Sequence, residues 1–159
     1  MFRLIVIFDG GVDGFVDGGI LLFLAERFQD KPLSFHDLSS KAQSLSWLSF
    51  ISSGFAVQLW SALEEAHPAP GAELRKSVVE QKNQDFFATL DILDKHLARR
   101  AFLSGDYSVA DTFATPLLDM LELVKGMEPD AYPHVFSWRD RLRARPSYKG
   151  VWPNEKEVK

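Results

Sequence analysis

The sequence predicts a mainly α fold, in which a small strand–turn–strand–helix piece precedes a bundle of long helices. A short β-branched and aromatic run, Leu4–Phe8, ends at a pair of glycines, which is typical of a buried strand. In the remainder of the chain, apolar residues recur at helical spacing, and Pro or Gly separates the periodic segments. We therefore expect a segment 1–30, an all-α domain 37–152 and a tail 153–159.

The N-terminal segment is predicted to contain two strands and one helix. Leu4–Phe8 and Val12–Val16 are the strands, and a glycine turn joins them. From Gly18 onward, "GGILLFLAERF" has apolar side chains over most of one helix face, with charged residues at its end. Asp17 stands directly before this helix, and an aspartate there is expected to cap it.

A long helix is predicted to follow, capped by Asp37 or Ser39 and running to about Glu65. Two stripes of residues are expected to face inward along it. The first stripe contains Leu45, Leu48, Ser52, Phe55, Leu59 and Ala62, and the second contains Trp47 and Ile51.

Three further helices are expected over Ala72–Arg99, Ser108–Lys125 and Tyr132–Arg145, with glycine or proline near their ends. Within "SVAD", Ser108 and Asp111 have the spacing of a capping box, with Asp in place of the usual Glu. The inward residues of the first and last of these helices are expected to be Val79, Phe86, Leu90, Leu93 and Leu97, and Val135, Trp138 and Leu142.

Composition excludes several classes of function. The 159 residues contain no cysteine, which removes disulfides and thiolate chemistry from this chain and fits a reducing, cytoplasmic location. A formal charge of −4 argues against a general nucleic-acid binder. The basic residues of "RDRLRARPSYK" are interleaved with acids, so a solvated helix face is favoured over a phosphate-binding patch. No apolar run has the length of a membrane span.

Local motifs point to no metal site. Asp9, Asp13 and Asp17 are spaced by four, whereas a calcium loop needs ligands at alternate positions. The same stretch contains neither a dinucleotide-binding nor a nucleotide-binding glycine pattern. The histidines at 36, 67, 96 and 134 form no local pair, so surface or capping roles are expected for them.

Several longer motifs together resemble the cytosolic glutathione S-transferase family. "FLSGDYSVADTFATPLLDML" and "YPHVFSWRDRLRARPSYKGVW" resemble its C-terminal helical domain, and "SLSWLSFISS" resembles the first long helix of that domain. "GGILLFLAERF" resembles the last helix of the family's thioredoxin-like N-terminal domain. The resemblance implies a C-terminal helical bundle preceded by a remnant of a thioredoxin-like fold.

The resemblance also implies departures from the family pattern. The chain is expected to be shortened at its N-terminus, without the segment that presents the thiol-activating residue, so we name no catalytic residue. The family's E-S-x-A-I motif, whose serine holds the γ-glutamyl carboxylate of glutathione, is altered. Asp17 stands at the serine position and Gly18 follows it, so only a weak glutathione site is expected there.

Two functions follow from the resemblance. As an enzyme, the protein would transfer glutathione to an apolar electrophile, with no other cofactor. A co-substrate pocket would be formed by Trp47, Phe50, Ile51, Phe113 and Leu117. The alternative is a non-catalytic interaction module that acts as a homodimer or binds a protein partner through a helix face. The small-residue stripe of Ser49, Ser52, Ser53, Gly54 and Ala56 would permit close approach of another helix.

Overall fold

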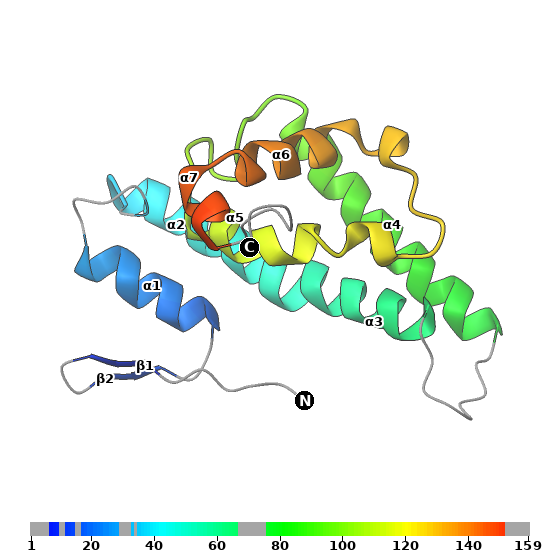
Figure 1. Cartoon of the computed structure of the whole chain (residues 1–159), viewed down its shortest axis with the longest axis horizontal. Coiled ribbons are helices and arrows are strands. Elements are labelled where there is room, and N and C mark those ends of the chain that lie inside the picture. Colours follow the sequence, from blue (N-terminus) through cyan, green and yellow to red (C-terminus); the bar gives the residue numbers. More distant parts are fainter. Residues whose placement is uncertain are drawn as a thin grey trace, which may run out of the picture.

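The computed structural model describes residues 7–9, 12–14, 17–28, 33, 35–66 and 76–151. Within these residues the protein is an all-α bundle with a small β-hairpin and one helix beside it (Figure 1). The mainly α prediction is confirmed. In Figure 1 the hairpin lies below α1, which itself flanks the start of the bundle.

The N-terminal piece consists of β1 (Ile7–Asp9), β2 (Val12–Gly14) and α1 (Asp17–Arg27). The two strands pair antiparallel, with Phe8 opposite Asp13. The predicted strands extend to residues outside the described part of the chain. The side chain of Asp17 also lies outside it, so the cap at this position stays a prediction.

The first long helix is one continuous path through α2 (Leu38–Ser49), a π-helical segment η1 (Phe50–Phe55) and α3 (Ala56–Ala66). Asp37 caps it, because its side chain accepts a hydrogen bond from the Ser40 N–H at 2.7 Å and Ser40 Oγ reaches back to the Asp37 N–H. The hydrogen bond from the Ser40 N–H lowers the pKa of Asp37.

The π-helical segment changes which residues face the core. The Ala56 N–H donates to the carbonyl of Ile51, five residues earlier, so this turn is wider than an α-turn. Ile51 and Phe55 are fully buried, whereas Ser52 is exposed. The prediction that Ser52 faces inward is therefore wrong, because the 3.6-residue period does not continue through η1.

Two more helices complete the centre of the bundle. α4 (Lys76–Leu97) packs against α3, and its predicted inward residues within the described part are buried: Phe86, Leu90, Leu93 and Leu97. α5 (Val109–Leu118) ends well before the predicted Lys125. Pro116 removes a backbone donor near its end, and the chain continues as a 3₁₀ turn, η2 (Leu121–Leu123).

The C-terminal part contains a 3₁₀ turn, η3 (Pro129–Ala131), followed by α6 (Pro133–Arg143) and α7 (Pro146–Val151). Val135, Trp138 and Leu142 of α6 are buried, as predicted. The Tyr132 side chain makes no cap at the start of α6. Asp94 of α4 supplies the cap instead, because its Oδ1 accepts the N–H groups of His134 and Val135 at 2.8 and 3.0 Å.

A buried carboxylate lies at the centre of the C-terminal half. Asp111 is fully buried on α5, where Ser108 and Asp111 form the capping box. Its Oδ1 accepts hydrogen bonds from the Leu103 N–H at 3.0 Å and the Trp138 indole at 2.9 Å. Its Oδ2 accepts from the Ser108 N–H at 2.9 Å and the Ser108 hydroxyl at 2.8 Å. Burial raises the pKa of Asp111, and these four hydrogen bonds act in the opposite direction.

Removal of the cap that α4 gives to α6 provides a test of this arrangement. Asp94→Ala leaves two N–H groups at the start of α6 without their acceptor, so the free energy of unfolding should fall by about 1–2 kcal/mol. Urea denaturation followed by circular dichroism measures this change. Asp91→Ala, on the exposed side of the same helix, is the matched control and should change stability by less than about 0.5 kcal/mol. Equal effects of the two substitutions would contradict the assigned cap.

Candidate functional site

An apolar cavity of about 460 Å³ lies where the N-terminal helix meets the bundle. We call it the α1–α2 cavity. Its lining consists of Gly18, Gly19 and Leu22 from α1, Leu45, Leu48 and Ser49 from α2, Ser52 from η1 and Phe113 from α5.

The local packing of α1 shapes this cavity. Gly18 is buried against Leu48, so that a Cβ at Gly18 would lie 3.6 Å from Leu48 Cδ2. Along the same helix Ala25 is buried in the core, which holds α1 against the bundle. α1 packs mainly against α5, and the absence of a side chain at Gly18 leaves room beside Leu48 of α2.

The chemistry of the lining suits an apolar ligand. None of the lining residues carries a charge, and four of them are leucine or phenylalanine. The hydroxyl of Ser52 donates to the carbonyl of Ser49 at 3.3 Å, so the polar groups at the rim are partly satisfied within the helix. A volume of this size accommodates a small organic molecule, with Phe113 available for aromatic contact.

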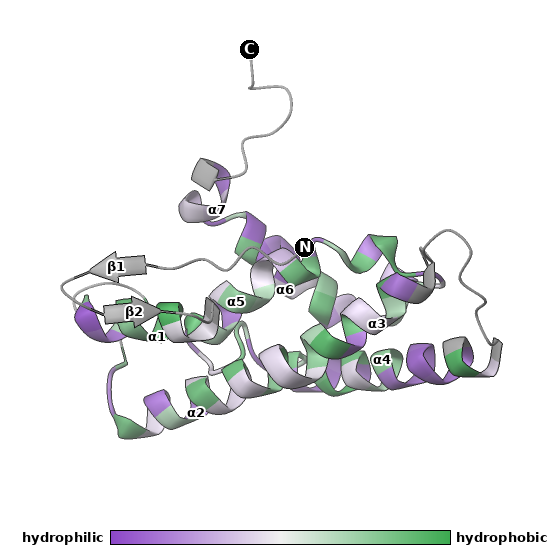
Figure 2. Ribbon diagram, turned by 90° about the horizontal axis from the view of Figure 1, so that it is seen from below, coloured by the Kyte–Doolittle hydropathy of each residue, from purple (hydrophilic) through white to green (hydrophobic). Residues whose placement is uncertain are grey.

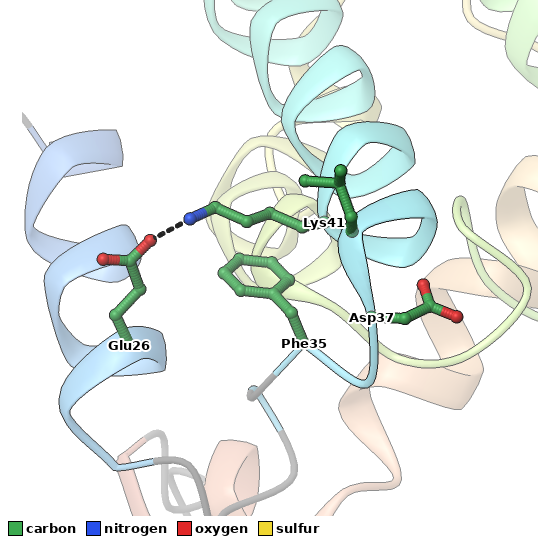
Figure 3. Close-up of a pocket in the computed structure, with 5 residues that line it drawn as sticks. Glu26, Phe35, Asp37 and Lys41 are labelled. Carbon is green, nitrogen blue, oxygen red and sulfur yellow. Dashed lines mark hydrogen bonds and ion pairs between the residues drawn. The ribbon is translucent and has the colours of Figure 1, made fainter.

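A second hollow of about 500 Å³ lies at the other end of α1 and is more polar. Figure 3 shows Lys41 of α2 reaching toward Glu26 of α1, with the ring of Phe35 beneath it and Asp37 turned away. The Lys41 ammonium lies 5.8 Å from the centre of the Phe35 ring. The protein's own ion pair thus occupies the polar side of this hollow and links α1 to α2.

The residues predicted as a site lie in three different places. Gly18 and Phe113 both line the α1–α2 cavity. The Trp47 ring lies elsewhere, with its centre 4.1 Å from the His96 ring and 5.5 Å from the ring of Phe50. Ile51 and Leu117 belong to the buried core. Asp17 begins α1, next to Gly18. The ligand roles of these residues stay predictions.

Sequence reasoning missed six residues of the cavity. Its wall also contains Gly19, Leu22, Leu45, Leu48, Ser49 and Ser52, although three of them are leucines that a helical period assigns to the core. Ser52 is exposed only because the π-helical turn shifts the phase of the helix. A six-residue π segment has no clear sequence signature, so periodicity alone would not have found this residue.

The basic run near the C-terminus is engaged within the protein. Arg139 pairs with Glu122 at 2.7 Å, and Arg143 pairs with Asp119 at 2.7 Å. The Arg145 guanidinium lies 3.4 Å from the centre of the Tyr107 ring. These contacts fasten the last helices to α5 and the turns beside it, which is a structural use of the charges.

The described part of the chain contains neither a metal-binding cluster nor a helix that could cross a membrane. Among residues whose placement is described, no three His, Asp or Glu side chains converge as a metal site would require. No described helix combines the length and apolar character that a membrane crossing needs.

Comparison with known proteins identifies the family. The family described as "Glutathione S-transferase, C-terminal domain" matches residues 51–146. The chain belongs to the glutathione S-transferase family. A relative from Oryza sativa subsp. japonica, "Probable glutathione S-transferase GSTF2", is 30% identical over 163 residues, covering 89% of this chain and 72% of the relative.

A bacterial relative is similar over much of the same chain. "Disulfide-bond oxidoreductase YghU" from Escherichia coli is 27% identical over 143 residues, covering 85% of this chain. The glutathione S-transferase-like chain spans 48% of the length of that protein. Since this chain contains no cysteine, it has no thiol of its own for disulfide exchange within these 159 residues.

Solved structures agree with the family fold. "Ure2p in Complex with Glutathione" superposes with a TM-score of 0.79 at 22% identity, covering 89% of this chain and 70% of that chain. A structure of "Glutathione S-Transferase-I bound with the ligand lactoylglutathione" gives a TM-score of 0.77 at 24% identity, covering 92% and 72%. At these identities the similarity establishes the fold.

Introducing a charge at the rim of the α1–α2 cavity should weaken the binding of apolar ligands. Ser52→Arg places a guanidinium at the rim, and the expected result is a severalfold loss of affinity for an anilinonaphthalene fluorophore. Ser53→Arg is the matched control, since Ser53 is the next residue, is also exposed and does not line the cavity. Fluorescence titration measures both. The assignment of the cavity fails if Ser53→Arg weakens binding as much as Ser52→Arg.

Proposed function

We propose that this glutathione S-transferase-like protein holds an apolar electrophile in the α1–α2 cavity, for conjugation to glutathione as co-substrate. The observation that carries the proposal is an uncharged, leucine- and phenylalanine-lined cavity of about 460 Å³ in a member of this family. In the conjugation, the glutathione thiol loses its proton to solvent, its sulfur forms a bond to the electrophilic carbon, and a leaving group such as chloride departs. The chain would supply the apolar part of such a site.

We further propose that residues 1–30 correspond to the end of a thioredoxin-like domain and that this chain binds glutathione weakly. The order strand, strand, helix in β1, β2 and α1 supports the first part. Asp17 at the first residue of α1 supports the second, because its carboxylate would repel the carboxylate of glutathione at a helix N-terminus. The lack of cysteine excludes a thiol donor within the chain, and no hydroxyl donor is assigned. A cytoplasmic location is consistent with that composition.

The activity itself is tested by retention on immobilised glutathione and by turnover of a chloronitrobenzene with glutathione. Weak retention and little turnover are expected of the chain as sequenced. Strong retention with rapid turnover would contradict the weak site. The apolar cavity is assessed separately by the fluorophore titration, so the two parts of the proposal can fail independently.

Replacing the carboxylate at the start of α1 should strengthen glutathione binding. Asp17→Ser removes a negative charge next to the helix N-terminus and restores the family's hydroxyl, so a severalfold increase in retained protein is expected. Asp130→Ser, in the exposed turn η3, changes the net charge equally and should have no effect. Elution from glutathione resin at fixed salt measures both variants. Equal retention of Asp17→Ser and the parent would exclude Asp17 as the cause.

An interaction module is the second candidate, and one surface favours it. Residues 42–63 contain no charged side chain, although a quarter of the whole chain is charged. On the exposed side of this stretch lie the small residues Ser49, Ser52 and Ser53, followed by Val57 and Trp60, which are 52% and 43% exposed. An uncharged helix face with small residues at its centre permits the close approach of a second helix.

A charge on this face should prevent dimerisation if the face forms a homodimer. Val57→Glu is expected to shift the protein from dimer to monomer, because the carboxylate would be desolvated at the interface. Leu123→Glu is the control, since Leu123 is similarly exposed, at 57%, but lies on η2 outside this face. Size-exclusion chromatography with light scattering measures the mass. A parent protein that is monomeric at all concentrations would exclude the homodimer.

A further inference from the structure

Three serine hydroxyls connect the buried carboxylate of Asp111 to a small cavity between α2 and the start of α5. Ser108 Oγ lies 2.8 Å from Asp111 Oδ2, and Ser104 Oγ lies 3.5 Å from Ser108 Oγ. Ser44 Oγ, on the buried side of α2, lies 3.2 Å from Ser104 Oγ. We call Ser44, Ser104 and Ser108 the serine chain. Its middle link is at the long limit of a hydrogen bond, so it is the weakest of the three.

The direction of every hydrogen bond in the serine chain is determined by its inner end. A hydroxyl has one proton to donate, and an ionised carboxylate only accepts. Ser108 therefore donates to Asp111, Ser104 must donate to Ser108, and Ser44 must donate to Ser104. All three protons point toward the carboxylate. In such a series each bond polarises the next, which strengthens the whole chain.

Ser44, at the outer end of the serine chain, consequently offers lone pairs but no proton to the cavity. The cavity has a volume of about 40 Å³, and both Ser44 and Ser108 on its wall are more than nine-tenths buried. Ser40 also lines it, but its hydroxyl proton is donated to the carbonyl of Asp37 at 2.9 Å. The serine hydroxyls around the cavity thus offer acceptors whose own protons are used elsewhere. A ligand that bonds to these serine hydroxyls has to donate the hydrogen bond.

We propose that this cavity binds a structural water molecule, which donates to Ser44 Oγ and completes a polar link between α2 and the start of α5. The size fits, because a water molecule occupies about 30 Å³ in the liquid and needs two to four polar partners. The Asp106 carboxylate on the same wall can accept the second proton of the water. The site lies apart from the α1–α2 cavity and does not depend on the proposed conjugation.

Water-selective NMR of the ¹⁵N-labelled full chain tests the site directly. Cross-peaks at the water frequency are expected for the amide protons of Ser44 and Ser104. Their sign should invert between the NOE and ROE versions of the experiment, because dipolar contact with bound water inverts and direct exchange of the amide proton with water does not. Failure to see such peaks in the parent protein would overturn the proposal.

Two variants test whether the serine chain holds the water. Ser44→Ala removes the outer acceptor, so the dipolar peaks at Ser104 should disappear. Hydrogen exchange of the Trp138 indole N–H, which donates to Asp111, should also become severalfold faster, because Ser108 then donates a less polarised hydroxyl to the carboxylate. Ser46→Ala is the matched control, since Ser46 is on the same helix, is exposed, and its hydroxyl donates to the Ala42 carbonyl rather than to the serine chain. It should leave both signals unchanged.

Two other outcomes would overturn the proposal. If the dipolar peaks at Ser104 persist in Ser44→Ala, the serine chain does not hold the water molecule. Shifts of the Ser44 and Ser104 amide resonances on addition of ammonium chloride, but not of sodium chloride, would show that the cavity binds an ammonium-type cation instead. The measurement on the parent protein needs no variant, so instability of Ser44→Ala would still leave the proposal tested.

Discussion

The buried carboxylate of Asp111 is the interaction on which the C-terminal half of the fold depends. It accepts hydrogen bonds from three separate parts of the chain: the turn at Leu103, the start of α5 at Ser108 and the side chain of Trp138 in α6. A neutral side chain of the same size could not satisfy all of these donors. Because unsatisfied buried donors each cost about 1–3 kcal/mol, loss of the carboxylate would disturb several elements together.

The surroundings of Asp111 explain why an acid is tolerated in the core. Desolvation disfavours the charged carboxylate. Each of its two oxygens, however, accepts two hydrogen bonds. The same carboxylate completes the capping box at the start of α5. It also accepts the indole N–H of Trp138, the largest fully buried side chain among the described residues. The capping box of α5 thus also fixes how α6 packs against α5, through the bond from Trp138.

Much of this arrangement was predictable from local sequence, and the remainder was not. The caps at Asp37 and Ser108 follow from residue type and spacing, because both partners lie within three residues of each other. The indole bond of Trp138 to Asp111 spans 27 residues, and no local pattern indicates it. The early end of α5 was missed because apolar residues continue beyond Pro116.

The candidate site was less predictable than the fold, for a related reason. Phe113 and Gly18 were identified from family motifs, but the wall of the α1–α2 cavity depends on how closely two helices approach and on one widened turn. Periodicity describes a single regular helix and contains no information on either feature. Figure 2 shows hydrophobic and hydrophilic residues alternating along α2.

The cap that Asp94 gives to α6 links two elements about 40 residues apart, and it has a consequence for the order of folding. Tyr132 gives α6 no side-chain cap of its own, so the first turn of that helix gains its acceptor only after α4 has formed and docked. The cap of α6 is therefore a contact between residues far apart in the sequence, and contacts of this kind are slow to form. Loss of α4 should therefore also destabilise the start of α6, so the two helices should unfold as one unit.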